Sequence, residues 1–202
     1  MGQFTEYQNI PDHKGAIVKT NPFTIIMGPI VYTSEYRLAY EHPMAPFQCL
    51  QVGISYLGKS PFLSLVERTD SSLSSSDIRY SVRGFRFQLT YKLYILEIQN
   101  KYRFYIGPHF SFSTAKVTYK SLLNSDNYLK ATYINYNLLF GYQTTIFTRR
   151  MDLDLFAGVG YRNNKWEEHF NGNTAPMDDT GMYYFDGPFK IMFGFNIGFM
   201  LK

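Results

Sequence analysis

The end of the chain, residues 187–202, alternates between large apolar side chains and mostly small or polar ones. Side chains of a β-strand point to opposite faces with a period of two, so this segment predicts a strand. Its apolar face consists of Phe189, Ile191, Phe193, Phe195, Ile197, Phe199 and Leu201. Its other face includes Gly194, Asn196 and Gly198. Such a large apolar stripe must leave water, so it lies either in a protein core or in lipid.

The same alternation recurs in seven earlier segments. They cover residues 16–27, 31–41, 47–58, 80–96, 102–120, 129–146 and 152–166. Eight is an even number, and each segment is long enough to cross a bilayer as a tilted strand, which needs about 9–11 residues. The sequence therefore predicts an all-β, eight-stranded antiparallel up-and-down transmembrane β-barrel over residues 15–202. Residues 1–14 are expected to form a periplasmic N-terminal segment.

The connections differ in length on the two sides of this predicted barrel. Those at 42–46, 97–101 and 148–151 are short, whereas 67–77 and 167–187 are long and polar. Two connections, after the first and fifth strands, are shorter and interrupt the regularity. Short turns on one side and longer loops on the other are typical of barrels in the Gram-negative outer membrane, and they put both termini in the periplasm. The N-terminus MGQFTEYQNI has no apolar core of signal-peptide type, so we expect the signal peptide to have been removed.

Composition supports strands and excludes several other classes of protein. The chain holds 18 Phe and 18 Tyr, and aromatic residues favour strands and collect at membrane interfaces. No apolar run of about 18 residues is present, so no transmembrane helix is predicted. Cys49 is the only cysteine, which excludes an intrachain disulfide. The net charge of +4 is spread along the chain without a basic run beyond Arg149 and Arg150, so we expect no nucleic-acid partner.

Alternation alone leaves open which face points inward. The alternative is a soluble eight-stranded lipocalin-like carrier, with an apolar interior and a polar exterior. Three features favour lipid outside. The polar face is rich in Gly, Ser and Asn with few charges, and the first strand lacks the Gly-x-Trp signature of lipocalins. The apolar faces of several strands also end in tyrosine, as an interfacial girdle would.

If lipid lies outside, a set of charged residues faces the barrel interior. This predicted interior charge cluster consists of Glu35, Arg37, Glu41, Arg86, Lys92, Arg103, Asp154 and Arg162. Eight strands leave an interior that side chains can fill, and opposite charges there would pair because an unpaired buried charge is expensive. A gated or proton-linked pore is the alternative. We expect a filled barrel that acts as a structural or accessory subunit of an envelope complex, with outer-membrane lipid, lipopolysaccharide and other outer-membrane proteins as partners.

The N-terminal third, VKTNPFTIIMGPIVYTSEYRLAYEHPMAPFQCLQVGISYLG, resembles Bacteroidota-type outer-membrane barrels of unknown function. That family has a Lys-x-Asn-Pro first strand, a second strand ending in Tyr-Glu and a glycine-containing third strand. The matching residues are Lys19, Asn21, Pro22, Tyr40, Glu41 and Gly53. The closing FGFNIGFMLK resembles the terminal strand by which barrels are recognised for assembly, although it ends in Leu-Lys and not in an aromatic residue. The resemblance implies a fold and a compartment, and it brings no known activity and no catalytic residues.

His109 and Ser111 are the candidate catalytic residues. Their spacing in PHFSFS is similar to the His-x-Ser of the eight-stranded outer-membrane lipid A deacylases, although Phe112 stands where that family has Asn. A serine hydroxyl needs an adjacent base to become a nucleophile. A lipid A-modifying enzyme is therefore an alternative function, and an interior histidine bonded to Ser or Tyr is the other interpretation. The remaining histidines are isolated in turns, so we expect no metal site and no cofactor.

Overall fold

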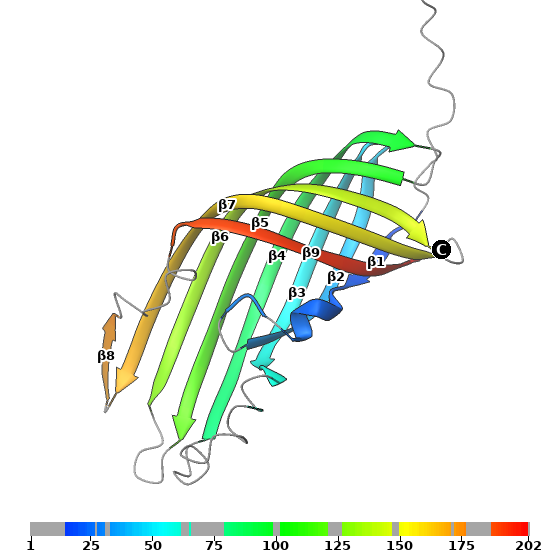
Figure 1. Ribbon diagram of the computed structural model, residues 1–202. Helices are drawn as coiled ribbons and strands as arrows, with labels where there is room; N and C mark the ends of the chain where they lie inside the picture. The colour runs from blue at the N-terminus through cyan, green and yellow to red at the C-terminus, as the bar shows by residue number, and fades with distance from the viewer. Residues whose placement is uncertain are drawn as a thin grey trace, which may run out of the picture.

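The computed structural model describes residues 15–26, 28–30, 33–61, 65, 79–98, 102–120, 127–146, 150–170, 172–176 and 187–201. These residues form strands almost throughout (Figure 1). In chain order the elements are β1 (Ile17–Thr20), the 3-10 helix η1 (Pro22–Ile25), β2 (Thr33–Ala45), β3 (Gln48–Lys59), β4 (Arg79–Ile98), β5 (Tyr102–Lys120), β6 (Tyr128–Ile146), β7 (Met151–Phe170), β8 (Asn173–Pro176) and β9 (Phe189–Met200). The expected N-terminal segment, 1–14, lies outside the described residues.

The strands close into a ring. Each strand from β1 to β7 pairs with the next one along the chain, β7 pairs with β9, and β9 pairs with β1. All pairings are antiparallel, and β8 adds a short hairpin strand to the end of β7 outside the ring. The prediction of an all-β, eight-stranded antiparallel up-and-down barrel is confirmed. The wall is uneven, because β4 and β7 have 20 residues whereas β3 and β9 have 12.

The first strand is much shorter than the expected 16–27. It ends at Thr20 because the next residues start a helical turn. The side chain of Asn21 accepts hydrogen bonds from the backbone N–H groups of Phe23 and Thr24, and Pro22 occupies the first position of η1. Asparagine at the N-cap and proline at the first helical position are favoured helix starts. The Asn-Pro pair therefore takes the chain out of the sheet.

The turn after β1 then covers the edge of β2 that β1 leaves open. The hydroxyl of Thr20 donates to the carbonyl of Arg37, and the hydroxyl of Thr24 donates to the carbonyl of Glu35. Farther along, the N–H of Gly28 donates to the carbonyl of Thr33. Exposed backbone groups at a sheet edge are costly in lipid, so these bonds replace part of the missing strand.

Other boundaries also differ from the sequence-based expectation. β2 continues through the expected turn at 42–46, because a bulge between Pro43 and Ala45 accommodates the proline. β7 runs to Phe170 and forms a hairpin with β8, so the first part of the expected loop at 167–187 is a strand pair. Gly172, at the tip of this hairpin, has a φ of 82°, which glycine adopts readily. The remaining strand ends differ by one or two residues.

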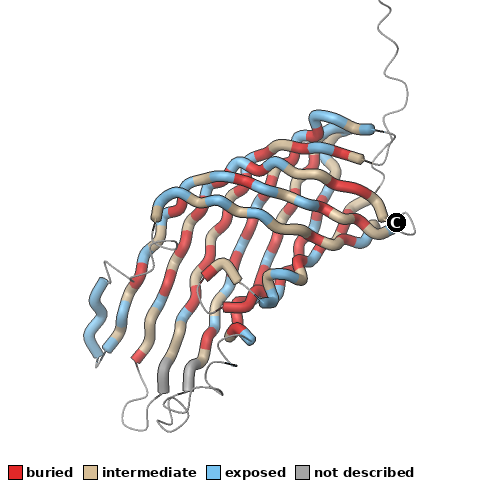
Figure 2. The backbone as a smooth tube through the Cα atoms, in the orientation of Figure 1, coloured by how far each residue is buried: buried red, intermediate tan, exposed pale blue. Residues whose placement is uncertain are grey.

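Buried and exposed residues alternate along the strands (Figure 2). The buried residues are mostly polar and face the interior, whereas large apolar residues are exposed on the outside. Phe193 is 75% exposed on the outside, whereas Glu35 is fully buried. Other exposed apolar side chains lie on β2, β3, β4, β6, β7 and β9 and include Leu38, Ile54, Phe85, Phe140, Leu155 and Ile191. This arrangement is the reverse of the one that a soluble lipocalin-like carrier requires. The outer surface is suited to a solvent of hydrocarbon.

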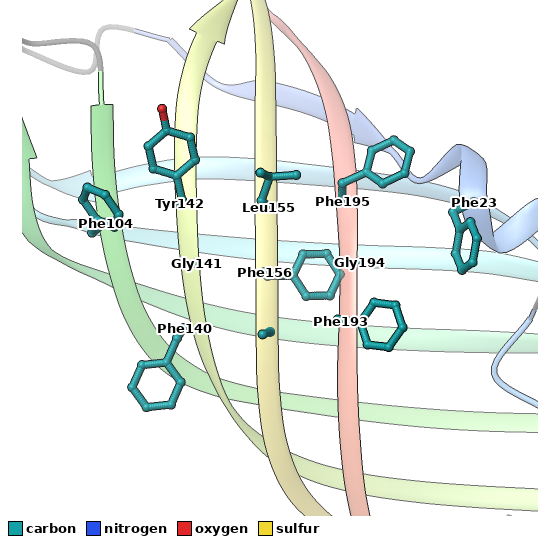
Figure 3. A pocket seen from close by; sticks show the side chains of 11 residues that line it. Phe23, Phe104, Phe140, Gly141, Tyr142, Leu155, Phe156, Phe193, Gly194 and Phe195 are labelled. Atoms are coloured by element: carbon teal, nitrogen blue, oxygen red, sulfur yellow. The ribbon is translucent and has the colours of Figure 1, made fainter.

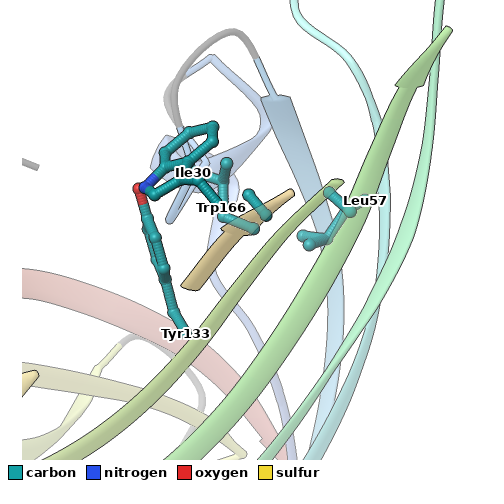
Figure 4. Packing of buried hydrophobic residues seen from close by; sticks show 6 residues of the cluster. Ile30, Leu57, Tyr133 and Trp166 are labelled. Carbon is teal, nitrogen blue, oxygen red and sulfur yellow. The ribbon is translucent and has the colours of Figure 1, made fainter. Parts of the chain in front are cut away.

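One end of the interior is filled by apolar side chains, which we call the apolar plug. It consists of Ile30, Leu57, Ala115, Ala131, Tyr133 and Trp166 (Figure 4). Ile30 belongs to the segment between η1 and β2 and is 2% exposed, so this segment reaches into the barrel. The rings of Tyr133 and Trp166 meet edge to face, with their centroids 5.8 Å apart. The plug lies at the end of the barrel opposite to Ile17 and Met200.

The seam between β1 and β9 depends on Gly198, which lies between Lys19 and Asp152. A Cβ atom there would lie 2.7 Å from Cγ2 of Ile17 and 2.9 Å from Cγ of Lys19. We expect Gly198→Ala to lower the free energy of unfolding in detergent by about 1–3 kcal/mol, because overpacked sites must shift. The matched control is Gly53→Ala, where the nearest atom is the flexible end of Gln88 at 3.2 Å. Urea unfolding that ranks the two variants in the opposite order would contradict the role of Gly198.

Candidate functional site

The interior near Ile17 and Met200 holds a network of ion pairs, which we call the lower charge cluster. Its members are Lys19, Glu41, Lys92, Asp152 and Asp154. The Lys19 ammonium lies 2.8 Å from Glu41 and 3.0 Å from both Asp152 and Asp154. The Lys92 ammonium lies 2.7 Å from Glu41 and 2.6 Å from Asp154. All five side chains are at most 2% exposed, so each charge is balanced inside the protein.

Neutral side chains complete the hydrogen bonding of this cluster. Tyr105 donates to Asp154 over 2.8 Å, and the Gln143 amide donates to both oxygens of Asp152 over 2.9 Å. Asn196 also donates to Asp154, over 3.2 Å. Removing one member of this network leaves a buried charge unpaired. The resulting loss of folding free energy is far larger than the contribution of an exposed ion pair.

A second layer lies between the lower charge cluster and the apolar plug. Arg86 donates to Glu35 over 2.8 Å, and the Ser55 hydroxyl donates to the other oxygen of Glu35 over 2.6 Å. Arg86 also donates to the Ser111 hydroxyl over 3.3 Å, and Asn135 donates to the same hydroxyl over 3.1 Å. These bonds join β2, β3, β4, β5 and β6 across the lumen.

The eight residues of the predicted interior charge cluster are all buried: Glu35, Arg37, Glu41, Arg86, Lys92, Arg103, Asp154 and Arg162. They fall into two groups and not one. Glu35 pairs with Arg86, while Glu41, Lys92 and Asp154 belong to the lower charge cluster. Arg103 reaches to 3.9 Å from Asp152, and Arg162 donates to Asn135. The side chain of Arg37 has neither an ion pair nor a hydrogen bond among the described residues.

Two members of the lower charge cluster, Lys19 and Asp152, were absent from the sequence-based set. Both carried a usable signal. Asp152 has the same parity as Asp154, so it faces the same side of the strand. Lys19 lies on the same face of its predicted strand as Asn21. If that face pointed outward, the lysine charge would lie in lipid, so the inward direction was the better prediction. Charge on the inward parity at strand ends should therefore have been included.

The two candidate catalytic residues are buried but are not joined. His109 is 3% exposed, and its Nδ1 lies 2.7 Å from the Thr90 hydroxyl. Ser111 is fully buried and accepts hydrogen bonds from Arg86 and Asn135. No hydrogen bond links the two side chains, both of which the structure describes, so His109 is not placed to activate Ser111 as a nucleophile.

The lumen is closed by side chains. Within the described residues, the interior contains a cavity of only 10 Å³, lined by residues that include Arg37, Gln51, His109, Phe156 and Asn196. This is about the room that one water molecule needs. The lower charge cluster lies below this cavity and the apolar plug lies above it, so side chains fill the described lumen on both sides.

The outer wall carries a groove of 640 Å³ across β6, β7 and β9 (Figure 3). Its lining includes Ala157, which pairs with Phe140 on one side and Phe193 on the other. Large side chains border it, with Phe104 at one end and Phe23 of η1 at the other. The groove is therefore a hollow in the surface that faces the surroundings of the barrel, formed where one small residue lies among aromatic rings.

The described part of the chain contains neither a membrane helix nor a metal centre. No helix within it is long and apolar enough to cross a membrane. No group of three or more His, Cys, Asp or Glu side chains among the same residues is arranged to hold a metal ion.

No protein-family model matches the sequence, and no curated protein matches it. Solved structures give two distant likenesses. One is a major outer membrane protein from Thermus thermophilus, with 9% identity and a TM-score of 0.49, covering 92% of this chain and 98% of that one. The other is CarO from Acinetobacter baumannii, with 10% identity and a TM-score of 0.42, covering 93% of this chain and 97% of that one. The description of the fold rests on the strand pairing itself.

The lower charge cluster predicts strong coupling between Lys92 and Asp154. We expect Asp154→Asn to lower the free energy of unfolding by about 3–5 kcal/mol, because Lys19 and Lys92 lose a buried partner. In a double-mutant cycle with Lys92→Gln, the two losses should fail to add, with a coupling of about 0.5–3 kcal/mol. The exposed pair Lys165 and Glu167, 2.7 Å apart, is the control and should show no measurable coupling. Additive losses at Lys92 and Asp154 would contradict this assignment.

Proposed function

We propose that this protein is an integral β-barrel of the bacterial outer membrane that does not conduct solutes and serves as a structural or accessory subunit of an envelope complex. Its termini would face the periplasm. The observation that carries the proposal is the inverted distribution of polarity, with lipid-compatible side chains outside and a lumen filled by paired charges. The resemblance of the N-terminal third to Bacteroidota-type outer-membrane barrels supports the same compartment.

The filled lumen argues against transport as the role. Solute passage would require the ion pairs of Lys19 and Lys92 to separate inside the barrel, and separated buried charges are strongly unfavourable. If the lumen is closed, the outer surface of the barrel is the part of the protein that can contact other molecules. This supports a role through contacts with lipid and with neighbouring proteins.

Contacts with lipopolysaccharide are supported by a row of exposed cations at the plug end of the barrel. Arg83, Lys116 and Lys130 are neighbours across β4, β5 and β6. Lys130 and Lys165 extend the row, and their ammonium groups lie 3.4 Å and 2.7 Å from the Glu167 carboxylate. With both termini in the periplasm, this row faces the outer leaflet, where lipid phosphates would complement its charge.

Contacts with another envelope protein are supported by the groove around Ala157. Contact with lipid alone does not require a groove in the barrel wall. A concave aromatic surface can hold an apolar side chain of a membrane-embedded partner. The groove lies on β6, β7 and β9, whereas β4 is three strands away from β7 around the ring and contributes no residue to the groove. A partner that binds the groove would therefore contact one side of the barrel and leave the other to lipid.

Photo-crosslinking in the native membrane tests this proposal. A photoreactive phenylalanine at Phe193, in the groove, should crosslink to one envelope protein, whereas the same group at Phe85 on β4 should reach lipid alone. Ala157→Trp fills the groove, so it should remove the protein crosslink without lowering barrel stability, because its side chain faces lipid. Equal crosslinking patterns at Phe193 and Phe85, or a pattern that Ala157→Trp leaves unchanged, would reject the accessory role.

The non-conducting lumen has its own test. Purified protein in a planar bilayer should give no stable current steps in salt solution, because the charge network blocks the lumen. Reproducible single-channel steps from the unaltered protein, absent from a matched detergent control, would show that the barrel is a pore.

A further inference from the structure

Arg37 is a buried cation that the described structure leaves unpaired. It is 8% exposed, and its Nε has no hydrogen-bond partner. The two carboxylates whose charges act on Arg37 are Glu35 and Asp154, and both already form ion pairs with other cations. Arg86 bonds to Glu35, and Lys92 bonds to Asp154. A buried guanidinium without a partner is strongly unfavourable, so the lumen lacks a countercharge at this position.

Arg37 lines the 10 Å³ cavity, and three other unpartnered atoms lie in the same wall. They belong to Gln51 (Oε1), His109 (Nε2) and Asn196 (Oδ1), whose side chains are at most 3% exposed. Buried polar atoms are almost always satisfied, so several orphan atoms around one cavity indicate a bound guest. The cavity has room for about one small guest.

Of the four unpartnered atoms, Oε1 of Gln51 and Oδ1 of Asn196 are acceptors, and the wall offers more donors than acceptors only when the Gln51 amide is turned to present its NH₂ group. Nε of Arg37 is a donor. If the Thr90 hydroxyl donates to Nδ1 of His109, the neutral ring carries its proton on Nε2, which then also donates. Neither end of the Gln51 amide has a partner among the described residues, so its NH₂ group can face the cavity. Asn196 is an exception, since its amide nitrogen already donates to Asp154. The Asp154 carboxylate also lines the cavity, but both of its oxygens already accept hydrogen bonds, from Lys92 and Tyr105 among others.

The surrounding charge is positive. Among the described residues the buried cations outnumber the buried carboxylates. The cations are Lys19, Arg37, Arg86, Lys92, Arg103 and Arg162, and the carboxylates are Glu35, Glu41, Asp152 and Asp154. Lys190, which also faces inward, lies near enough to His109 to act on it electrostatically, as do Arg86 and Lys92. A cavity with convergent donors in a positive field selects an anion.

We propose that this cavity binds one small monovalent inorganic anion of the halide class, held by Arg37, His109 and Gln51. The anion supplies the countercharge that Arg37 lacks. The cavity is too small for sulfate or phosphate, and Met192 in its wall can adjust because its side chain is unbranched and flexible. The site is independent of any partner on the outer wall and so goes beyond the accessory role.

Halide-dependent stability tests the site. The unfolding midpoint of the purified protein in detergent should rise with sodium chloride or bromide and then level off, relative to sodium gluconate at equal ionic strength. Arg37→Met should abolish this dependence, and in gluconate its midpoint should equal or exceed that of the unaltered protein, because an unpaired charge is gone. Arg150→Met, which removes an exposed arginine, should keep the full halide response.

A crystal of the unaltered protein grown in bromide gives an answer that needs no variant. An anomalous bromide peak in the cavity, within hydrogen-bond distance of Nε of Arg37, is the expected result. Density for a water molecule without an anomalous signal would overturn the proposal. So would equal unfolding midpoints in chloride and gluconate, or an unchanged halide response in Arg37→Met.

Discussion

The ion pairs of Lys19 are the interaction on which closure of this barrel depends. Lys19 comes from β1, the four-residue strand that joins β2 to β9, and its ammonium meets carboxylates of both β2 and β7. Such a short strand contributes few ladder hydrogen bonds. Charge pairing across the lumen therefore reinforces the seam at the place where the backbone contributes least, and Gly198 leaves the space that this pairing requires.

Alternation predicted the type and order of the ring strands, because a period of two is a direct consequence of backbone geometry. It could not show where the chain leaves the sheet. At Asn21 and Pro22 the deciding signal was helix capping, a local effect that overrode an otherwise suitable apolar pattern. At residues 171–172 the Asn-Gly pair was an unused signal for the β7–β8 hairpin, since that dipeptide favours tight hairpin turns, whereas a loop was predicted there.

The interior charges were predictable by parity, and their partners were not. Lys19 and Asp154 are 135 residues apart, and their contact depends on strand register and on the closure of the ring. The same holds for the groove, which requires Phe140, Ala157 and Phe193 to lie side by side on three strands. Arg37 illustrates the limit most clearly. Its position on β2 predicted burial, whereas its lack of a partner follows from which neighbours had already been engaged.

The stretch that contains β1 and the segment after it couples closure of the ring to plugging of its mouth. Residues 17–30 contain both the strand that completes the ring and Ile30, which occupies the mouth. β1 is made first, yet one of its two neighbours is β9, the last strand of the ring to be synthesised. The ring therefore cannot close until the chain has been made as far as β9. Because the same short stretch also carries Ile30, a change that frees β1 from β9 would loosen the chain that holds Ile30 against Trp166 and Tyr133.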